Sequence, residues 1–192
     1  VSKNKFLKVV LPALLVVAII CQAVGFQAVL AKGNVATTSS DSISNLTDQQ
    51  LQALTNPILQ SYKADSSHKV WKMTNDSRLA VLANQTNIEN ARLQEVVKLV
   101  NSEFVEKEII SSPLAMVYAQ EKDVSYGDIL IDIDQTSSIT SSSNSKEAYK
   151  ITIGENGVRL TGASENAIMH GLRTIQNLII TNDGLVYGEI VD

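Results

Sequence analysis

Cysteine, aromatic residues and basic charge are all scarce in this chain. One cysteine, Cys21, occurs in 192 residues, so it has no partner for a disulfide within the chain. If the chain is exported, as its first segment suggests below, the lack of disulfides suits a bacterial surface protein better than a small secreted eukaryotic domain. The 16 Lys and Arg are outnumbered by 20 Asp and Glu, and no basic run is interleaved with aromatic residues. Nucleic-acid binding is therefore not expected.

Long apolar runs are also rare, and the longest lies at the start of the sequence. Three lysines within the first eight residues precede an apolar stretch at 9–31. This layout is typical of a secretory signal peptide, with cleavage after Ala31. The stretch is also long enough to span a bilayer, so residues 1–31 would contact the membrane as an anchor if they were uncleaved. Two glutamines and a glycine in its second half favour cleavage and a secreted or cell-surface location.

Beyond this segment the composition predicts a tether followed by one domain. Residues 32–55 are mostly small and polar, which predicts a flexible tether with a short helix that opens at Thr47. The remaining residues, 56–192, have the length of one ordinary domain, and the chain as a whole is 44% hydrophobic. We therefore expect a single folded core in that range.

Two later segments have the apolar spacing of amphipathic helices. The first runs from about residue 90 to 108, and its predicted buried face consists of Leu93, Val96, Val97, Leu99, Val100, Phe104 and Val105. The second begins after the N-cap Ser164 and ends at 182–184, and its predicted buried face consists of Ala167, Ile168, Gly171, Leu172, Ile175, Leu178 and Ile179.

Short apolar or alternating runs predict the strands. They lie at 70–73, 78–83, 114–119, 129–133 and 185–191, with a hairpin formed by 148–153 and 158–163 around Asn156-Gly157. The run at 114–119 is of the kind that is buried within a sheet. The order predicts an α+β fold: a mostly antiparallel sheet with two helices packed on one face and a more polar opposite face.

Several residues could suggest a reactive site, but their patterns favour structural roles. Asp128, Asp132 and Asp134 alternate along one strand, which predicts a solvated face and lacks the glycine and terminal glutamate of a calcium loop. His68 and His170 lie in a turn and on a helix, which is poor evidence for zinc. The serines at 136–145 have no Gly-x-Ser-x-Gly frame.

The two aromatic residues that could stack on a sugar, Trp71 and Tyr149, fall in strand patterns. In such patterns an aromatic side chain more often fills the core. We therefore expect no catalytic residue, no cofactor and no metal site within this chain.

The motifs taken together resemble a known family. They are W-x-x-T-x-D-x-R at 71–78, GDILIDID at 127–134, EAYKITI at 147–153, GVRLTGAS at 157–164 and AIMHGLRTIQNLI at 167–179. In order and spacing they resemble the small N-terminal domain that precedes the catalytic barrel in glycoside hydrolase family 20, the β-N-acetylhexosaminidases. The resemblance covers roughly residues 56–192. Gly162 and Gly171 fit a close crossing of helix and sheet, while Arg173 and Gln176 would face polar backbone or a neighbouring domain.

The resemblance implies an inactive piece of a glycosidase. The family's reaction uses the substrate's own acetamido oxygen, with an Asp and a Glu that belong to the barrel. Their His-x-Gly and Asp-Glu context does not occur in this sequence. We therefore predict a truncated, exported, non-catalytic domain whose partner is a (β/α)8 barrel that hydrolyses terminal N-acetylhexosamine residues of glycans.

Two other hypotheses belong to different classes. The first is a stand-alone exported carbohydrate-binding or cell-wall interaction module, suggested by the export signal and the Ser/Thr-rich tether. The second is a membrane-tethered structural domain, which requires that residues 1–31 stay uncleaved.

Overall fold

The computed structural model describes residues 43–55, 58–135, 139 and 146–192. The predicted signal segment, most of the predicted tether and most of the serine-rich loop therefore lie outside the described residues. Within the described part, no helix combines the length and the apolarity needed to cross a bilayer.

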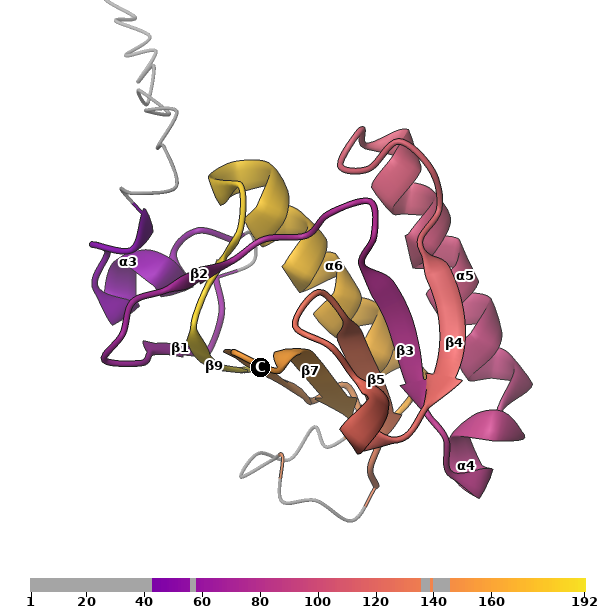
Figure 1. Ribbon diagram of the computed structural model, residues 1–192. Coiled ribbons are helices and arrows are strands. Elements are labelled where there is room, and N and C mark those ends of the chain that lie inside the picture. Colours follow the sequence, from indigo (N-terminus) through magenta and orange to yellow (C-terminus); the bar gives the residue numbers. More distant parts are fainter. Residues whose placement is uncertain (1–42, 56–57, 136–138, 140–145) are drawn as a thin grey trace, which may run out of the picture. The chain divides into compact units, whose positions relative to one another are not determined.

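The predicted α+β class is confirmed, with helices and strands in mixed order (Figure 1). The helices are α3 (Asp48–Gln52), α4 (Gln85–Ile88), α5 (Ala91–Glu106) and α6 (Glu165–Asn182), with a 3₁₀ turn η1 (Glu121–Asp123). The strands are β1 (Ser61–Ala64), β2 (Val70–Trp71), β3 (Arg78–Leu82), β4 (Ala115–Ala119), β5 (Ile129–Ile133), β6 (Tyr149–Gly154), β7 (Gly157–Gly162), β8 (Leu185–Val186) and β9 (Gly188–Val191).

Seven strands form one sheet in the order β1-β9-β6-β7-β5-β3-β4, and β2 and β8 form a separate antiparallel pair. The prediction of a mostly antiparallel sheet is wrong. β3 runs parallel to both β4 and β5, and β5 runs parallel to β7, whereas the remaining pairs in this sheet are antiparallel. The neighbours of β3 are parallel to it because α5 and the connection 120–128 each return the chain to the same end of the sheet. β7 is parallel to β5 because β6 runs in the opposite direction and lies on the far side of β7.

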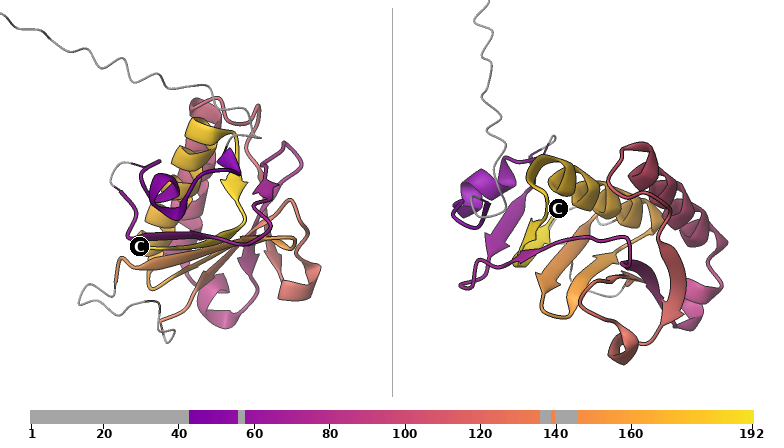
Figure 2. Two further views of the ribbon diagram at one scale, coloured as in Figure 1. Left: turned by 90° about the vertical axis from the view of Figure 1, so that its left-hand side faces the viewer. Right: turned by 45° about the horizontal axis from the view of Figure 1, so that its top comes forward.

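The two long helices pack on the same face of the sheet, as predicted (Figure 2). The caps also agree with the sequence, because Asn90 and Ser164 accept hydrogen bonds from the third residue of α5 and α6, and Asp183 ends α6 in the left-handed conformation. One position of the predicted faces is wrong. Leu99 is 51% exposed on the outer side of α5.

The core between helices and sheet also takes in residues from the predicted tether. The helix α3 begins at the predicted cap, where Thr47 and Gln50 form a capping box. Ile43 and Leu51 are almost fully buried and belong to the same hydrophobic cluster as the helices and the sheet. The folded core therefore includes side chains that precede residue 56.

The predicted hairpin is present as β6 and β7, joined by a two-residue turn. The turn consists of Glu155 and Asn156. Gly157, which follows it, has a positive φ of 92°, while Asn156 does not. The predicted last strand is split at Tyr187, and Gly188, the first residue of β9, adopts φ 150°. The sequence pattern also missed the short elements β1 and α4.

Helix α6 crosses the sheet at two glycines, as the sequence indicated. A Cβ atom on Gly171 would lie 2.3 Å from Leu160 Cδ1, and one on Gly162 would lie 2.8 Å from Ile168 Cδ1. Both distances are too short for a real contact, so the close approach of α6 to β7 depends on these positions having no side chain.

We expect Gly171→Ala to lower the free energy of unfolding by about 2 kcal/mol, because the overpacking exceeds the gain in helix propensity. Gly154→Ala is the matched control, since a Cβ atom there meets nothing within 4 Å. Urea unfolding followed by circular dichroism measures both. Equal stabilities of the two variants would contradict the close crossing.

Candidate functional site

The motif at 71–78 holds the connection 120–128 against the sheet. The indole of Trp71 is fully buried, and its Nε1 donates to the carbonyl of Tyr126 at 2.7 Å. A turn closes between Thr74 and Ser77, where the Ser77 hydroxyl accepts from the Thr74 amide. The tryptophan and the arginine of the motif thus contact the same connection, from β2 and β3 respectively.

Arg78 provides the second contact. Its Nε and Nη2 donate to the two carboxylate oxygens of Asp128 at 2.9 and 2.5 Å, and Nη2 also reaches the carbonyl of Asp123. Asp128 is 1% exposed and also accepts from the amide and hydroxyl of Ser125. Burial works to raise the pKa of Asp128, but the hydrogen bonds from Arg78 and Ser125 outweigh it and hold the pKa below its ordinary value.

The prediction of a solvated acidic face is therefore wrong for two of the three aspartates. Asp132 is 7% exposed, accepts from the side-chain amides of Asn84 and Asn87, and lies 3.3 Å from Arg159. Asp134 is only half-buried. The two buried carboxylates serve separate structural networks at opposite ends of β5. No group of three His, Cys, Asp or Glu side chains among the described residues could hold a metal ion.

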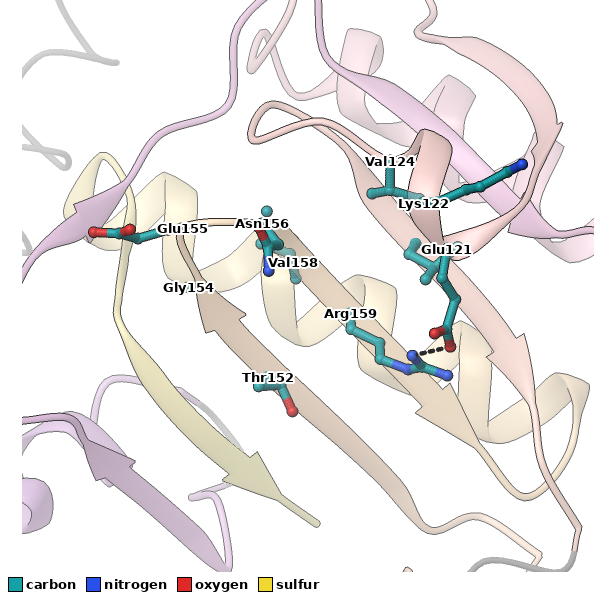
Figure 3. A pocket seen from close by; sticks show the side chains of 11 residues that line it. Glu121, Lys122, Val124, Thr152, Gly154, Glu155, Asn156, Val158 and Arg159 are labelled. Carbon is teal, nitrogen blue, oxygen red and sulfur yellow. Dashed lines mark hydrogen bonds and ion pairs between the residues drawn. The ribbon is translucent and has the colours of Figure 1, made fainter.

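A shallow groove of about 530 Å³ lies on the sheet face opposite the helices, which we call the open face (Figure 3). Its lining comes from the connection 120–128, from β6 and from the β6–β7 hairpin: Glu121, Lys122, Val124, Thr152, Asn156 and Arg159. In Figure 3 the Arg159 guanidinium points toward Glu121 and forms an ion pair with it. The Arg159 guanidinium is already paired with Glu121 and Asp132, so it is not free to bind an anionic ligand in the groove.

Polar contacts also join the two helices. Arg173 of α6 donates to both carboxylate oxygens of Glu103 on α5, at 3.2 and 2.6 Å, and these bonds lower the pKa of Glu103. Lys107 donates to the side-chain oxygen of Gln176, whose amide is fully buried. The polar groups of Arg173 and Gln176 therefore bind side chains of α5 and its C-cap. The expectation that they face polar backbone or a neighbouring domain is not met.

The outer surfaces of the two helices differ in charge. The outer side of α6 carries an almost uncharged row of exposed or half-buried residues, which we call the α6 stripe: Asn166, Met169, His170, Arg173, Asn177, Ile180 and Thr181. Its one charge, Arg173, is neutralised by Glu103. The exposed side of α5 carries Arg92, Glu95, Lys98 and Glu106 instead. Loss of charge in the centre of a surface patch is typical of protein interfaces.

The remaining candidates take the places that the sequence favoured. His68 lies in the β1–β2 turn with φ 48°, and His170 is exposed on α6. Tyr149 is buried, and its hydroxyl contacts Thr174 at 2.6 Å and Asp192 at 3.2 Å. Trp71 and Tyr149 are thus core residues and are not available to stack on a sugar. The predicted serines at 136–145 lie outside the described residues.

The pairs formed by Glu103, Glu121 and Arg159 were not predicted. Their partners come from other elements, so no spacing along the chain marks them. The uncharged outer side of α6 could have been predicted from the sequence, because the helix positions opposite the predicted apolar face contain almost no charged residues.

Comparison with known families gives a match over most of the described fold. The family model described as glycosyl hydrolase family 20, domain 2 matches residues 55–192. No curated protein matches the chain.

Solved structures with a similar fold include two bacterial glycosidases. One is the Streptomyces plicatus N-acetyl-beta-hexosaminidase in complex with Thio-NAglucal, with 13% identity and a TM-score of 0.53 over 77% of this chain. Another is the Flavobacterium johnsoniae chitobiase, with 14% identity and a TM-score of 0.51 over 71% of this chain. At such identities the likeness concerns the fold alone. The chain spans 27% and 20% of their respective lengths.

Proposed function

Since the chain belongs to glycosyl hydrolase family 20 through its domain 2, we propose that it is an exported, non-catalytic domain that supports a (β/α)8 barrel. The proposal places hydrolysis of terminal N-acetylhexosamine residues in that barrel. It is supported by the names of two proteins of similar fold, an N-acetyl-beta-hexosaminidase and a chitobiase. The location, secreted or at a bacterial cell surface, follows from the apolar segment at 9–31 and is part of the same proposal.

The observation that carries the supporting role is the difference between the two faces of the domain. The open face is polar and internally paired, with ion pairs between Lys150 and Glu189 and between Arg159 and Glu121. The α6 stripe has no unpaired charge, and Ile180 is 54% exposed on it. The free-energy cost of removing water from polar groups is therefore lower when a rigid neighbour docks on the helix side. The barrel could contact the domain through the sheet side or the helix side, and we infer the helix side.

The polar contacts between α5 and α6 fit this role. A docking surface must hold its shape when the partner is absent, because ordering it on binding lowers the affinity. The pairs Arg173–Glu103 and Lys107–Gln176 tie the two helices together near that surface. The stripe is thus presented on a pre-organised pair of helices.

We expect a charge in the α6 stripe to weaken the interaction with the barrel. In the polypeptide that carries both domains, Asn177→Glu or Ile180→Glu should raise the sensitivity of the barrel to heat and protease, with a loss of domain affinity of roughly 100-fold. Asn156→Glu, at the exposed β6–β7 turn, is the control with the same added charge. Hydrolysis of an aryl N-acetylglucosaminide after heating reports the state of the barrel.

Two results would overturn the proposal. The first is equal behaviour of the stripe variants and the Asn156→Glu control, which would exclude docking through α6. The second is hydrolysis of the aryl N-acetylglucosaminide by this chain alone, lost on substitution of one of its own acids. The reading frame after codon 192 gives an independent check, since we expect a family 20 barrel to be encoded there.

The alternative function, a sugar-binding module, rests on the groove of the open face. Thr152 and Asn156 present hydrogen-bonding groups there, as Figure 3 shows. The aromatic residues that would have supplied stacking, Trp71 and Tyr149, are buried. Titration with chitin oligomers separates the two functions, because the supporting domain is expected not to bind them and a module would bind them with saturation.

A further inference from the structure

One edge of the large sheet is open, and it is formed by β4. Its apolar sequence predicted a strand buried within the sheet, but β4 is the edge strand and Tyr118 is 47% exposed. The carbonyl of Ala119 accepts from the amide of Ala83, which follows β3, at 2.9 Å. Because peptide groups alternate in direction along a strand, those of Ala115, Val117 and Ala119 face β3, and those of Met116 and Tyr118 face outward.

Side chains bind individual peptide groups at the other edge of the sheet and just before β4. At the β1 edge, the carboxylate of Asp48 on α3 accepts from the amide of Ala64 at 3.0 Å. Just before β4, the side chain of Asn101 satisfies both the amide and the carbonyl of Leu114, at 2.9 and 2.8 Å. Among the described residues, no comparable contact reaches the outward peptide groups of Met116 and Tyr118. Two donors and two acceptors are left open there.

The strand also lacks the devices that usually protect an edge. Native edges are guarded by lysine, proline, bulges or inward-pointing charges, because an open edge pairs with other strands. The residues of β4 are Ala-Met-Val-Tyr-Ala, with no charge and no proline. We propose that the β4 edges of two copies of this chain pair antiparallel about a two-fold axis at Val117, and so join two sheets into one.

The register follows from the positions of the open groups. An antiparallel pair exchanges hydrogen bonds where outward-facing residues lie opposite each other. With Val117 opposite Val117 of the second copy, each Met116 lies opposite a Tyr118, and all four open groups on each copy find partners. A shift by two residues would instead place one outward residue against Leu114, whose groups Asn101 already occupies, or against Gln120.

The side chains are compatible with this register. The strand has no charge, so no like charges lie opposite each other, and each Met116 thioether would lie beside the ring of a Tyr118, which is a favourable contact. Beside β4, a hollow of about 570 Å³ lined by Gln120, Glu121 and Lys122 would lie next to residues 112–114 of the second copy. A contact confined to one strand and its surroundings is of the small, transient class, so the dimer should form at high protein concentration.

Cysteine cross-linking of the full chain tests the register. In a background with Cys21→Ser, we expect Val117→Cys to form a disulfide between copies under mild oxidation, because Cα atoms of a non-hydrogen-bonded antiparallel pair lie about 4.5 Å apart. Ala115→Cys is the matched control on the same strand and face. Its two copies would lie about 13 Å apart, which is beyond the reach of a disulfide. The expected difference in rate is at least tenfold.

A second variant keeps the test decisive if Val117→Cys does not fold. The double variant Ala115→Cys/Ala119→Cys should cross-link between copies, because these positions lie opposite each other in the proposed register, whereas neither single variant should. Met116→Pro should slow the cross-linking of Val117→Cys, since it removes an outward amide without touching the ladder to β3. Equal cross-linking of all positions, as association through residues 1–31 would give, or none at any position, would overturn the proposal. Neither result bears on the barrel-supporting function.

Discussion

Replacing Trp71 with alanine is expected to lower the free energy of unfolding by about 4 kcal/mol, among the largest effects of any single substitution in this domain. The side chain is fully buried in the main hydrophobic cluster. Its removal leaves a cavity that the short pair β2–β8 cannot close, because these strands are only two residues long. The Tyr126 carbonyl also loses its donor. Chemical unfolding followed by far-ultraviolet circular dichroism measures the loss. Tryptophan fluorescence is not suitable, because Trp71 is the chain's one tryptophan and the variant removes it.

Trp71→Phe separates packing from hydrogen bonding. It keeps an aromatic ring in the core and removes the donor to Tyr126, so we expect a loss of about 1–2 kcal/mol. Protease cleavage within 120–128 should increase in both variants, because the indole nitrogen holds this connection. If Trp71→Phe were as stable as the native chain and 120–128 stayed resistant to protease, the hydrogen bond from the indole nitrogen would have no part in the effect.

The local elements of this fold were predictable because their signals are local. A helix face repeats every three to four residues, and the caps Asn90 and Ser164 stand directly before α5 and α6. The crossing glycines were also predictable, since Gly162 and Gly171 interrupt a strand and a helix that otherwise have strong patterns. Leu99 was wrongly assigned to the buried face because it is as apolar as its buried neighbours. Only the position of the sheet determines which apolar side chains of α5 are covered.

Strand direction was not predictable in the same way. The apolar pattern of β5 is the same whether its neighbours run parallel or antiparallel, and the direction is set by how the chain returns between strands. The connection 120–128 contains no long helix and therefore did not suggest a crossover. Its path depends on Trp71 and Arg78, which lie about fifty residues earlier in the sequence.

The same dependence explains the error over the aspartates. A period of two indicates a shared face and gives no information about what covers that face. In the structure the connection 120–128 and η1 lie over the open face of β5, and Val124 packs against a second small cluster of Ala80, Ala119 and Leu130. A solvated strand face thus became a buried one, with Arg78 and Arg159 supplied as partners for Asp128 and Asp132.

Arg78→Ala is expected to destabilise the domain by about 3 kcal/mol at neutral pH, because it leaves the buried Asp128 carboxylate with only Ser125 as a donor. In the native chain the pKa of Asp128 is depressed, so its contribution to stability is present above the pKa of an unfolded aspartate, roughly 3.9, and is lost as the pH falls through the lower folded value. In the variant, burial acts without the guanidinium, and the folded pKa should rise above the unfolded one. The variant should therefore regain stability relative to the native chain as the pH is lowered from 7 towards 5.

The double variant Arg78→Ala/Asp128→Asn isolates the buried charge as the cause. With no carboxylate to leave unpaired, it should be more stable at pH 7 than Arg78→Ala alone, and its difference from the native chain should not narrow between pH 7 and 5. Asp128→Asn alone should cost less than Arg78→Ala, because the Arg78 side chain is 36% exposed and can be hydrated. Urea unfolding at several pH values measures all four proteins. Parallel pH profiles for Arg78→Ala and the double variant would mean that neutralising the Asp128 charge is not the role of Arg78. The arginine would then stabilise the domain through its packing and its hydrogen bond to the Asp123 carbonyl.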